Sequence, residues 1–140
     1  SAMLHRYIKL TIDPTTAQGW AKNDDGQFLY YKNGKALAGT QIIGGTKYFF
    51  NTDGTLKTGW VQNGGNWYYY SGNKQLTGWC NIGSGESKQT YYFDTYGNMI
   101  SGKWIQIEGK WYYFNADGSL AKSTTVDGYE IDENGVRKTK

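Results

Sequence analysis

The sequence predicts an all-β fold, a solenoid built from repeated β-hairpins. Glycines recur every 19 to 24 residues, each followed by a run of aromatic residues and a turn. Helical periodicity is absent, and the 20 Gly, 13 Tyr and single Pro among 140 residues suit short strands and tight turns. A regular period of this length is typical of proteins in which each repeat packs only on its neighbours. The glycines that mark the period are Gly19, Gly39, Gly59, Gly78 and Gly102.

The repeat units alternate between two versions. The rich version begins with Gly-Trp and continues to a second aromatic run, as in Gly59-Trp60 and then Trp67-Tyr68. The poor version keeps the second run but lacks one or both leading aromatics, as in the unit that begins at Gly39. A terminal copy at Gly128-Tyr129 completes three pairs. We therefore expect about six hairpin repeats over residues 19–140.

Residues 1–18 match no repeat. Ser1-Ala2-Met3 is expected to be a cloning remnant, so that the chain is a piece of a longer protein. Strand character at residues 7–12, closed by Asp13-Pro14, indicates an N-terminal lead-in or cap.

Each unit is expected to form one hairpin. Residues 60–62 and 67–70 predict two strands, joined by a turn at Asn63-Gly64-Gly65. A second turn follows, written Thr52-Asp53-Gly54 in one unit, where glycine supplies the positive φ of the bend. A Leu or Met then anchors the linker to the next unit. Because Val, Ile and Leu are scarce, burial is expected to come from aromatic rings stacked between repeats.

Composition and charge exclude several classes of function. The net charge is only +3, and the basic run Arg137-Lys138-Thr139-Lys140 is confined to the C-terminus, so nucleic acid is not an expected partner. No stretch approaches the roughly 18 apolar residues of a transmembrane segment. The only histidine, His5, lies in the lead-in, and no Ser, Cys or Asp has an evident base partner, so no catalytic residue is expected.

Metal and cofactor binding are not expected either. The single Cys80 excludes a disulfide framework and a multi-cysteine metal site, and is interpreted as a small packing residue. Asp53, Asp117 and Asp127 each stand alone before a glycine, which is typical of turns rather than of a calcium site.

The rich hairpins predict an aromatic cage. Trp60 and Trp67 lie on the two arms of one hairpin, and side chains alternate faces along a strand, so both indoles can face the next unit. Tyr91 has the strand parity to close the cage from that next unit. Three rings without a charged residue suit a quaternary ammonium group, which donates no hydrogen bond but is attracted to ring faces.

The run from Gly59-Trp60 to Trp67-Tyr68-Tyr69-Tyr70 resembles the repeat of choline-binding cell-wall modules of pneumococci and related Gram-positive bacteria and phages. The stretch 102–118 is similar, and the resemblance covers residues 19 to about 135. It implies a left-handed β-solenoid that binds choline or phosphocholine on teichoic and lipoteichoic acids, and so an extracellular location at the bacterial cell surface. Modules of this family are often fused to cell-wall hydrolases, which leaves an activity in the parent protein open.

The resemblance also implies where the ligand binds. In the family, a site combines the Gly-Trp tryptophan, the tryptophan that opens the second strand, and a tyrosine of the next repeat. Phe28 stands where the N-terminal unit would have this second tryptophan. The expected choline-binding residues are Trp60, Trp67 and Tyr91 in a central set, Trp104, Trp111 and Tyr129 in a C-terminal set, and Trp20, Phe28 and Tyr48 in an N-terminal set.

The junctions after the poor units are expected to be structural joints. Thr40 and Lys47 offer no cage, and Trp79 with Tyr112 leaves one wall open. Several further rings are expected only to pack, namely Tyr30, Tyr69, Phe50, Phe93, Tyr113 and Phe114. Choline sites should therefore alternate with structural joints.

A second kind of ligand stays open. Similar Tyr-Tyr-Phe and Asp-Gly repeats occur in glucan-binding domains of streptococcal glucosyltransferases and in clostridial toxin repeats, whose ligands are polysaccharides. The poor unit over residues 44–54 resembles these as much as it resembles choline modules. The paired tryptophans favour choline, because they enclose a compact group better than they line an open groove.

Overall fold

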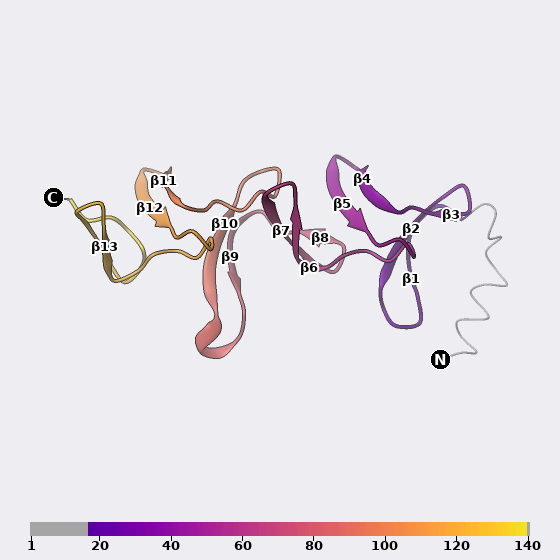
Figure 1. Ribbon diagram of the computed structural model, residues 1–140, viewed down its shortest axis with the longest axis horizontal. Coiled ribbons are helices and arrows are strands. Elements are labelled where there is room, and N and C mark those ends of the chain that lie inside the picture. The colour runs from indigo at the N-terminus through magenta and orange to yellow at the C-terminus, as the bar shows by residue number, and fades with distance from the viewer. Residues whose placement is uncertain (1–16, 140) are drawn as a thin grey trace. The chain divides into compact units, whose positions relative to one another are not determined.

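The computed structural model describes residues 17–139, and these residues form an all-β array of hairpins with one short 3-10 turn, Gly85–Ser87 (Figure 1). The lead-in strand predicted at residues 7–12 and His5 lie outside the described residues. Within residues 17–139 the strands are β1 (Gly19–Lys22), β2 (Phe28–Lys32), β3 (Lys35–Ala36), β4 (Gly39–Ile43), β5 (Thr46–Phe50), β6 (Gly59–Asn63), β7 (Asn66–Ser71), β8 (Lys74–Gln75), β9 (Gly78–Ile82), β10 (Gln89–Phe93), β11 (Lys103–Ile107), β12 (Lys110–Phe114), β13 (Thr124–Val126) and β14 (Tyr129–Ile131).

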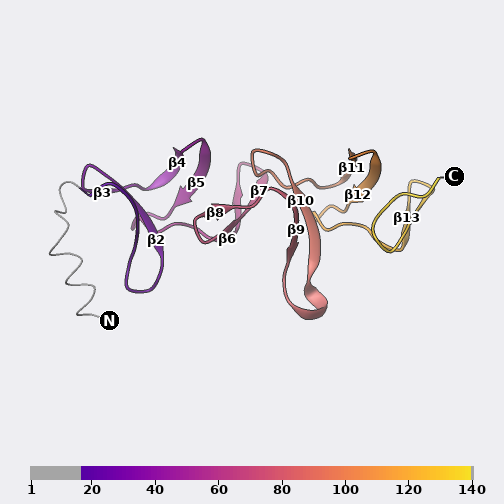
Figure 2. The same ribbon diagram turned by 180° about the vertical axis from the view of Figure 1, so that it is seen from behind.

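Each sheet is one hairpin, or one hairpin with a short third strand. β4 pairs with β5, β9 with β10, β11 with β12 and β13 with β14, always antiparallel. The sheets β1-β2-β3 and β6-β7-β8 have three strands. Figure 2 shows the same hairpins from behind, with β11 again beside β12. The predicted fold class, an all-β solenoid of repeated hairpins, is confirmed, and the left-handed winding stays a prediction.

The chain divides into two compact units. Unit 1 comprises the described residues up to Val61 together with Tyr69–Gln75. Unit 2 comprises Gln62–Tyr68 and the residues from Leu76 onward. Strands β1 to β5 therefore lie in unit 1 and β9 to β14 in unit 2, while β6 and β7 contribute residues to both.

The repeat glycines mark the entry to each hairpin. All five have positive φ, from 64° at Gly102 to 87° at Gly19. In this left-handed region a side chain is strained, whereas glycine adopts it at little cost. The period seen in the sequence is thus a period of backbone bends.

Two-residue turns close most hairpins. Gly44 and Gly45 connect β4 to β5 with φ values of 59° and 84°, as a type I′ turn requires. In the hairpin of β6 and β7 the turn residues are Gly64 and Gly65, and Asn63 is the last residue of β6. The predicted turn at Asn63-Gly64-Gly65 is therefore one residue too long, because two consecutive glycines supply both positive φ angles.

The second turn of each unit was predicted correctly. Gly54 has a φ of 90° and donates its N–H to the carbonyl of Asn51 at 2.9 Å. Gly118 has a φ of 89° and donates to Asn115 at 2.9 Å in the same way. These turns send the chain into the linker that leads to the next hairpin.

The linkers bond to two hairpins at once. In unit 1, Leu56 donates its N–H to the carbonyl of Phe28 in the hairpin before its own, at 2.8 Å, and Lys57 donates to Phe49 of its own hairpin. In unit 2, Leu120 and Thr90 form the corresponding backward bond at 2.8 Å. The anchoring leucine therefore ties its own repeat to the preceding one through its backbone. The side chains of Met99 and Leu120 lie beside Gly118 and Gly135 of the repeats that follow, as predicted for an anchor to the next unit.

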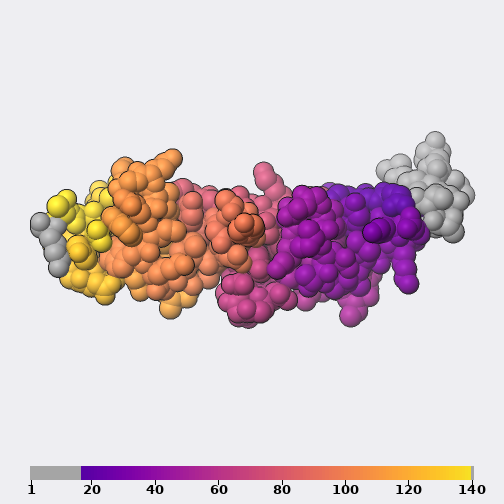
Figure 3. All heavy atoms as spheres, turned by 90° about the horizontal axis from the view of Figure 1, so that it is seen from above, coloured from indigo at the N-terminus to yellow at the C-terminus, as the bar shows by residue number. Residues whose placement is uncertain are grey.

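The core combines aromatic and aliphatic side chains. Tyr70, Phe93 and Phe114 are less than 2 % exposed, which agrees with the packing role predicted for the two phenylalanines. In unit 2, Phe114 forms a buried cluster with Ile100 and Leu120. Figure 3 shows the atoms of the last hairpin, in yellow, packed against those of β11 and β12, in orange. The few aliphatic residues thus contribute more burial than expected, because they lie between hairpins.

Candidate functional site

Where the first strand of a hairpin carries a tryptophan, the indole contacts a tyrosine of the same hairpin. Trp20 lies directly across the sheet from Tyr30, and Trp104 from Tyr113. The ring centroids lie 5.1 and 5.2 Å apart, with the rings edge to face. Two further pairs repeat this arrangement at 5.1 Å, namely Trp60 with Tyr69 and Trp79 with Tyr92. Tyrosines predicted only to pack therefore fix the orientation of the indoles.

The N-terminal set comes together within unit 1. The centroid of the Trp20 ring lies 6.0 Å from that of Phe28 and 5.0 Å from that of Tyr48. Tyr48 also donates its hydroxyl to the carbonyl of Asn73 at 3.0 Å. The Lys22 ammonium lies 4.9 Å from the Phe28 ring centroid, so this set already has one cation at its edge.

The C-terminal set comes together within unit 2, around a cation of the protein itself. The Trp104 and Tyr129 ring centroids are 5.8 Å apart. The guanidinium carbon of Arg137 lies 5.2 Å from the centroid of Trp104, 5.1 Å from that of Trp111 and 4.1 Å from that of Tyr129. All three predicted residues thus face one positive charge.

The Trp104 indole in this set is held at its nitrogen. Its Nε1–H donates to the Asp127 carboxylate at 2.7 Å. Asp127 and Gly128 form the turn between β13 and β14, and Asp127 has a φ of 51°. The aspartate predicted to be only a turn residue therefore also orients an indole.

The central set is divided between the units. Trp60 belongs to unit 1, whereas Trp67 and Tyr91 belong to unit 2. The two indoles are 37 % exposed each, so ligands in solution can reach both. The convergence of these three rings stays a prediction.

The junction at Trp79 has a polar residue, Thr90, at the position where the rich units have their second aromatic ring. The Trp79 centroid lies 4.9 Å from that of Tyr112. The Thr90 hydroxyl donates to Asn81 Oδ1 at 2.7 Å, and Lys122 Nζ lies 3.4 Å from the same hydroxyl oxygen. The structure thus brings Trp79 and Tyr112 into contact, and a threonine stands where the rich units have an aromatic ring.

A fourth residue at these junctions was not predicted from the sequence. It is the linker residue whose N–H bonds to the residue that opens the second strand of the preceding hairpin. Met99 donates to Trp67 at 2.9 Å, and Arg137 donates to Trp111 at 2.9 Å. The full set is Leu56, Met99, Leu120 and Arg137. Each stands two residues after the glycine of the second turn, a spacing that could have found them.

Two tyrosines of the sets, Tyr48 and Tyr91, stay neutral over a wide pH range. Burial raises the pKa of the Tyr48 phenol. Burial, and then the negative charge of Asp117, raises the pKa of Tyr91. Because a phenol ordinarily loses its proton only near pH 10, these rings present neutral π faces at physiological pH.

The acidic and cysteine side chains within residues 17–139 assemble no metal site, because no three of them could hold a metal ion together. Burial raises the pKa of the Cys80 thiol, whose sulfur lies 3.7 Å from the carbonyl oxygens of Thr77 and Gly78. None of the helices that the structure describes has the length and hydropathy to cross a membrane.

Hairpins whose indoles meet rings of the following hairpin define a repeat-type binding module. A family model described as a choline-binding repeat matches residues 37–75 and 76–127. The chain belongs to this family of choline-binding repeats.

Solved structures support the same assignment. The chain is similar to choline binding protein F from Streptococcus pneumoniae, solved in the presence of a peptidoglycan analogue, with 35 % identity and a TM-score of 0.71 over 88 % of this chain and 40 % of that one. It is also similar to the choline binding domain of Spr1274 from Streptococcus pneumoniae, with 38 % identity and a TM-score of 0.54 over 59 % of this chain and 96 % of that domain. The chain thus spans less than half of choline binding protein F.

One curated relative is an enzyme, unlike the two choline-binding proteins above. Glucosyltransferase-I of Streptococcus downei is 39 % identical over 54 residues, which are 39 % of this chain and 3 % of that protein. The similarity is therefore confined to a short part of a much longer chain.

Proposed function

We propose that this chain is a non-catalytic module that attaches a surface protein to the cell wall by binding choline or phosphocholine of teichoic and lipoteichoic acids. The observation that carries the proposal is the C-terminal set, where three aromatic rings surround one guanidinium at 4.1 to 5.2 Å. Rings that meet around one cation offer the same kind of attraction to another. Membership of the choline-binding repeat family supports choline as that cation.

A trimethylammonium group fits this chemistry because it cannot donate a hydrogen bond. A polar pocket gains little from such a cation, whereas each aromatic face contributes roughly 0.5–2 kcal/mol. The proposed ligand contacts are the central set Trp60, Trp67 and Tyr91, the C-terminal set Trp104, Trp111 and Tyr129, and the N-terminal set Trp20, Phe28 and Tyr48. Beside the central set, the backbone N–H of Met99 donates to the Trp67 carbonyl and so fixes the linker next to this tryptophan.

Attachment would depend on several weak sites acting together. One cage of three rings binds a small cation weakly, but a polymer that presents many choline groups engages several cages at once. The parent protein would be extracellular, and a hydrolase fused to such a module would be held close to its cell-wall substrate.

A choline titration tests the proposal directly. Tryptophan fluorescence of the purified chain should change and saturate in the millimolar range of choline. The control is 3,3-dimethyl-1-butanol, which has the shape of choline but carries no charge. If both compounds act equally, or neither acts, cation recognition by the rings is wrong.

A glucan is the second candidate ligand, and one observation favours it. The stretch shared with glucosyltransferase-I is 39 % identical, and exposed tryptophans such as Trp79, at 43 % exposure, suit stacking on sugar rings. Co-sedimentation of the chain with insoluble glucan, with and without choline, separates the candidates. The glucan would be favoured if the chain sediments with glucan equally well in the presence of choline and if choline does not change the tryptophan fluorescence.

A further inference from the structure

The last junction of the array contains an arginine where the other junctions contain an apolar residue. The backbone N–H of Arg137 bonds to the Trp111 carbonyl, and an isolated bridge pairs Arg137 with Ile131. Leu56, Met99 and Leu120 occupy the same position elsewhere in the repeat and form the same pair of backbone contacts. Two of the three, Leu56 and Leu120, are buried. The fold therefore holds the backbone at this position firmly, and in the last unit it presents a cation.

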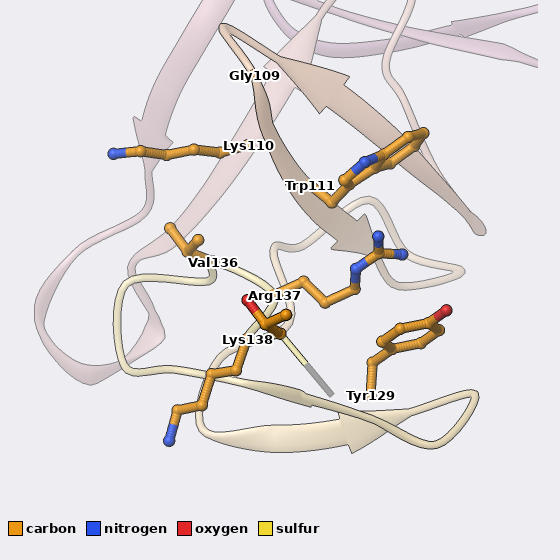
Figure 4. A pocket seen from close by; sticks show the side chains of 8 residues that line it. Gly109, Lys110, Trp111, Tyr129, Val136, Arg137 and Lys138 are labelled. Carbon is orange, nitrogen blue, oxygen red and sulfur yellow. The ribbon is translucent and has the colours of Figure 1, made fainter.

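The side chain of Arg137 points into the C-terminal set. Figure 4 shows its guanidinium directed between the rings of Trp111 and Tyr129, whereas Lys110 and Lys138 extend away from these rings. The three side chains of Trp111, Tyr129 and Arg137 line a pocket of about 290 Å³. A planar guanidinium stacks on aromatic faces more readily than an ammonium does, because it is more weakly hydrated. The shortest distance, 4.1 Å to the centroid of Tyr129, is that of a stacked cation.

Aromatic rings, rather than a carboxylate, surround this positive charge. Within residues 17–139 the structure shows no carboxylate in an ion pair with Arg137. The nearby Asp127 accepts a hydrogen bond from Trp104, and Glu130 pairs with Lys138 at 3.8 Å. A ligand cation that enters this cage must therefore replace the guanidinium or lie against a like charge.

We propose that Arg137 is a built-in competitor for the C-terminal cage and sets its affinity for quaternary ammonium ligands below that of the same cage with an apolar residue at this position. This inference rests on the proposed function. The apparent dissociation constant of a site rises in proportion as the fraction of molecules with the site open falls. Three ring contacts to a tethered cation are enough to weaken ligand binding about tenfold or more. Because of Arg137, the site at the C-terminal end of the array binds choline more weakly than it would with an apolar residue there.

The test follows each cage separately in one titration. Indole Nε1–H signals of a ¹⁵N-labelled chain are recorded against choline, with Trp60 and Trp67 reporting the central cage and Trp104 and Trp111 the C-terminal cage. Arg137→Leu places the residue of the equivalent positions Leu56 and Leu120 at this site, so the linker can keep its backbone bonds. Lys57→Gln, which removes one exposed positive charge in unit 1, controls for net charge.

In Arg137→Leu the apparent dissociation constant at Trp104 and Trp111 should fall about tenfold or more, while that at Trp60 and Trp67 stays the same. Lys57→Gln should change neither. Unchanged or weaker binding at Trp104 and Trp111, with normal binding at the central cage, overturns the role of Arg137 alone. If choline shifts none of the four indole Nε1–H signals in the unmodified chain, the proposed function is wrong.

A measurement without ligand tests the geometry itself. Ring currents of three faces should shift the δ protons of Arg137 strongly upfield in the unmodified chain, and millimolar choline should return them towards ordinary values. Ordinary chemical shifts of the Arg137 δ protons in the ligand-free protein would mean that the guanidinium does not occupy the cage. This conclusion does not depend on the result of the choline titration.

Discussion

Tryptophans that begin hairpins touch one tyrosine of their own hairpin and one of the following hairpin, as Trp79 and Trp20 show. Trp79 lies 5.1 Å from Tyr92 across its own hairpin and 4.9 Å from Tyr112 of the following one. Trp20 has the same two kinds of neighbour at 5.1 and 5.0 Å. Because both neighbours meet the indole roughly edge to face, its orientation is fixed before any ligand arrives. A cage built from such indoles loses little conformational entropy on binding.

Replacement of one proposed cage tryptophan tests whether the exposed indoles bind the ligand while the buried rings support the fold. Trp67→Ala should remove the central site, so that calorimetry counts one choline fewer, while the circular dichroism spectrum stays that of the parent chain. The reason is that the Trp67 ring is 37 % exposed, and the buried ring beside it in β7 is Tyr68.

Trp79→Ala is the matched control, because Trp79 is similarly exposed but lies at a junction where Thr90 stands in place of an aromatic ring. It should lower the unfolding temperature through lost ring contacts and leave the choline count unchanged. A normal count in Trp67→Ala, or a reduced count in Trp79→Ala, would contradict the assignment of sites.

Gly118 shows how closely the turns approach their neighbours. Its φ is 89°, and a Cβ there would lie 2.3 Å from the sulfur of Met99. Gly118→Ala should therefore suffer backbone strain of about 1–2 kcal/mol and overpacking of about 1–3 kcal/mol. Urea unfolding measures the sum.

The control for this change is Gly109→Ala. Gly109 has a φ of 82°, and nothing lies within 4 Å of the position that a Cβ would take there. It should suffer the backbone strain alone. Equal losses of stability in the two variants would show that Met99 moves aside freely and does not pack against this turn.

Single residues also show what the sequence could and could not predict. The resemblance of the repeats named the rings of the N-terminal and C-terminal sets, and the structure brings these rings together, while their role in ligand binding stays a prediction. Arg137 was assigned only to a basic C-terminal run. Its contact with Trp111 depends on a backbone bond between residues far apart in sequence, and charge alone does not reveal that bond.

At the scale of the element, the second turn of each hairpin is held by a short polar network. Asp117 Oδ1 accepts hydrogen bonds from the Ser119 hydroxyl at 2.6 Å and from the Ser119 N–H at 2.9 Å. The hydroxyl first, and then the N–H, lowers the pKa of the Asp117 carboxyl. Asp53 and Thr55 form the same network, with the same direction of shift. The ionised aspartate therefore stabilises the turn.

This network predicts a loss of stability in acid. A carboxyl whose pKa is lowered in the folded state contributes fully above its unfolded pKa of about 3.9 and loses that contribution as the pH falls through the folded pKa. The unfolding temperature should therefore be level near neutral pH and fall below about pH 4.

The double variant Asp53→Asn with Asp117→Asn tests the source of the acid loss. Its unfolding temperature should fall less steeply in acid than that of the parent chain, because the amide cannot titrate. The carboxyl shifts of Asp53 and Asp117, followed by NMR, give the two pKa values directly. Midpoints at or above the ordinary value for aspartate would refute the stabilising role of the turns.

The turns also mark where sequence reasoning lost precision. The turns at Asp53-Gly54 and Asp117-Gly118 were predicted correctly because in each of them one glycine occupies the single position with positive φ. At Gly64 and Gly65 two glycines follow an asparagine, and all three residues tolerate a bend. Which two of these residues form the turn is decided by the register of the paired strands. That register depends on which rings reach the core.

For the whole molecule, choline binding is expected to be a property of neutral rings. The raised pKa values of Tyr48 and Tyr91 keep both phenols protonated well above neutral pH. Choline carries a permanent charge. The choline affinity of the central cage should therefore be flat between about pH 6 and pH 8.

Calorimetric titrations across this range check the point, with heats corrected for the buffer. An affinity that changes tenfold over two pH units would require a titrating group in the cage, which the three proposed rings cannot supply. A flat profile together with competition from other quaternary amines is the expected result.

A crystal structure of the chain soaked with choline would test directly whether rings of successive hairpins enclose the ligand. We predict a trimethylammonium group enclosed by Trp60, Trp67 and Tyr91, and Arg137 still seated among Trp104, Trp111 and Tyr129 at low ligand concentration. A central set whose rings pack against one another without an opening, in crystals that take up no choline, would contradict this prediction.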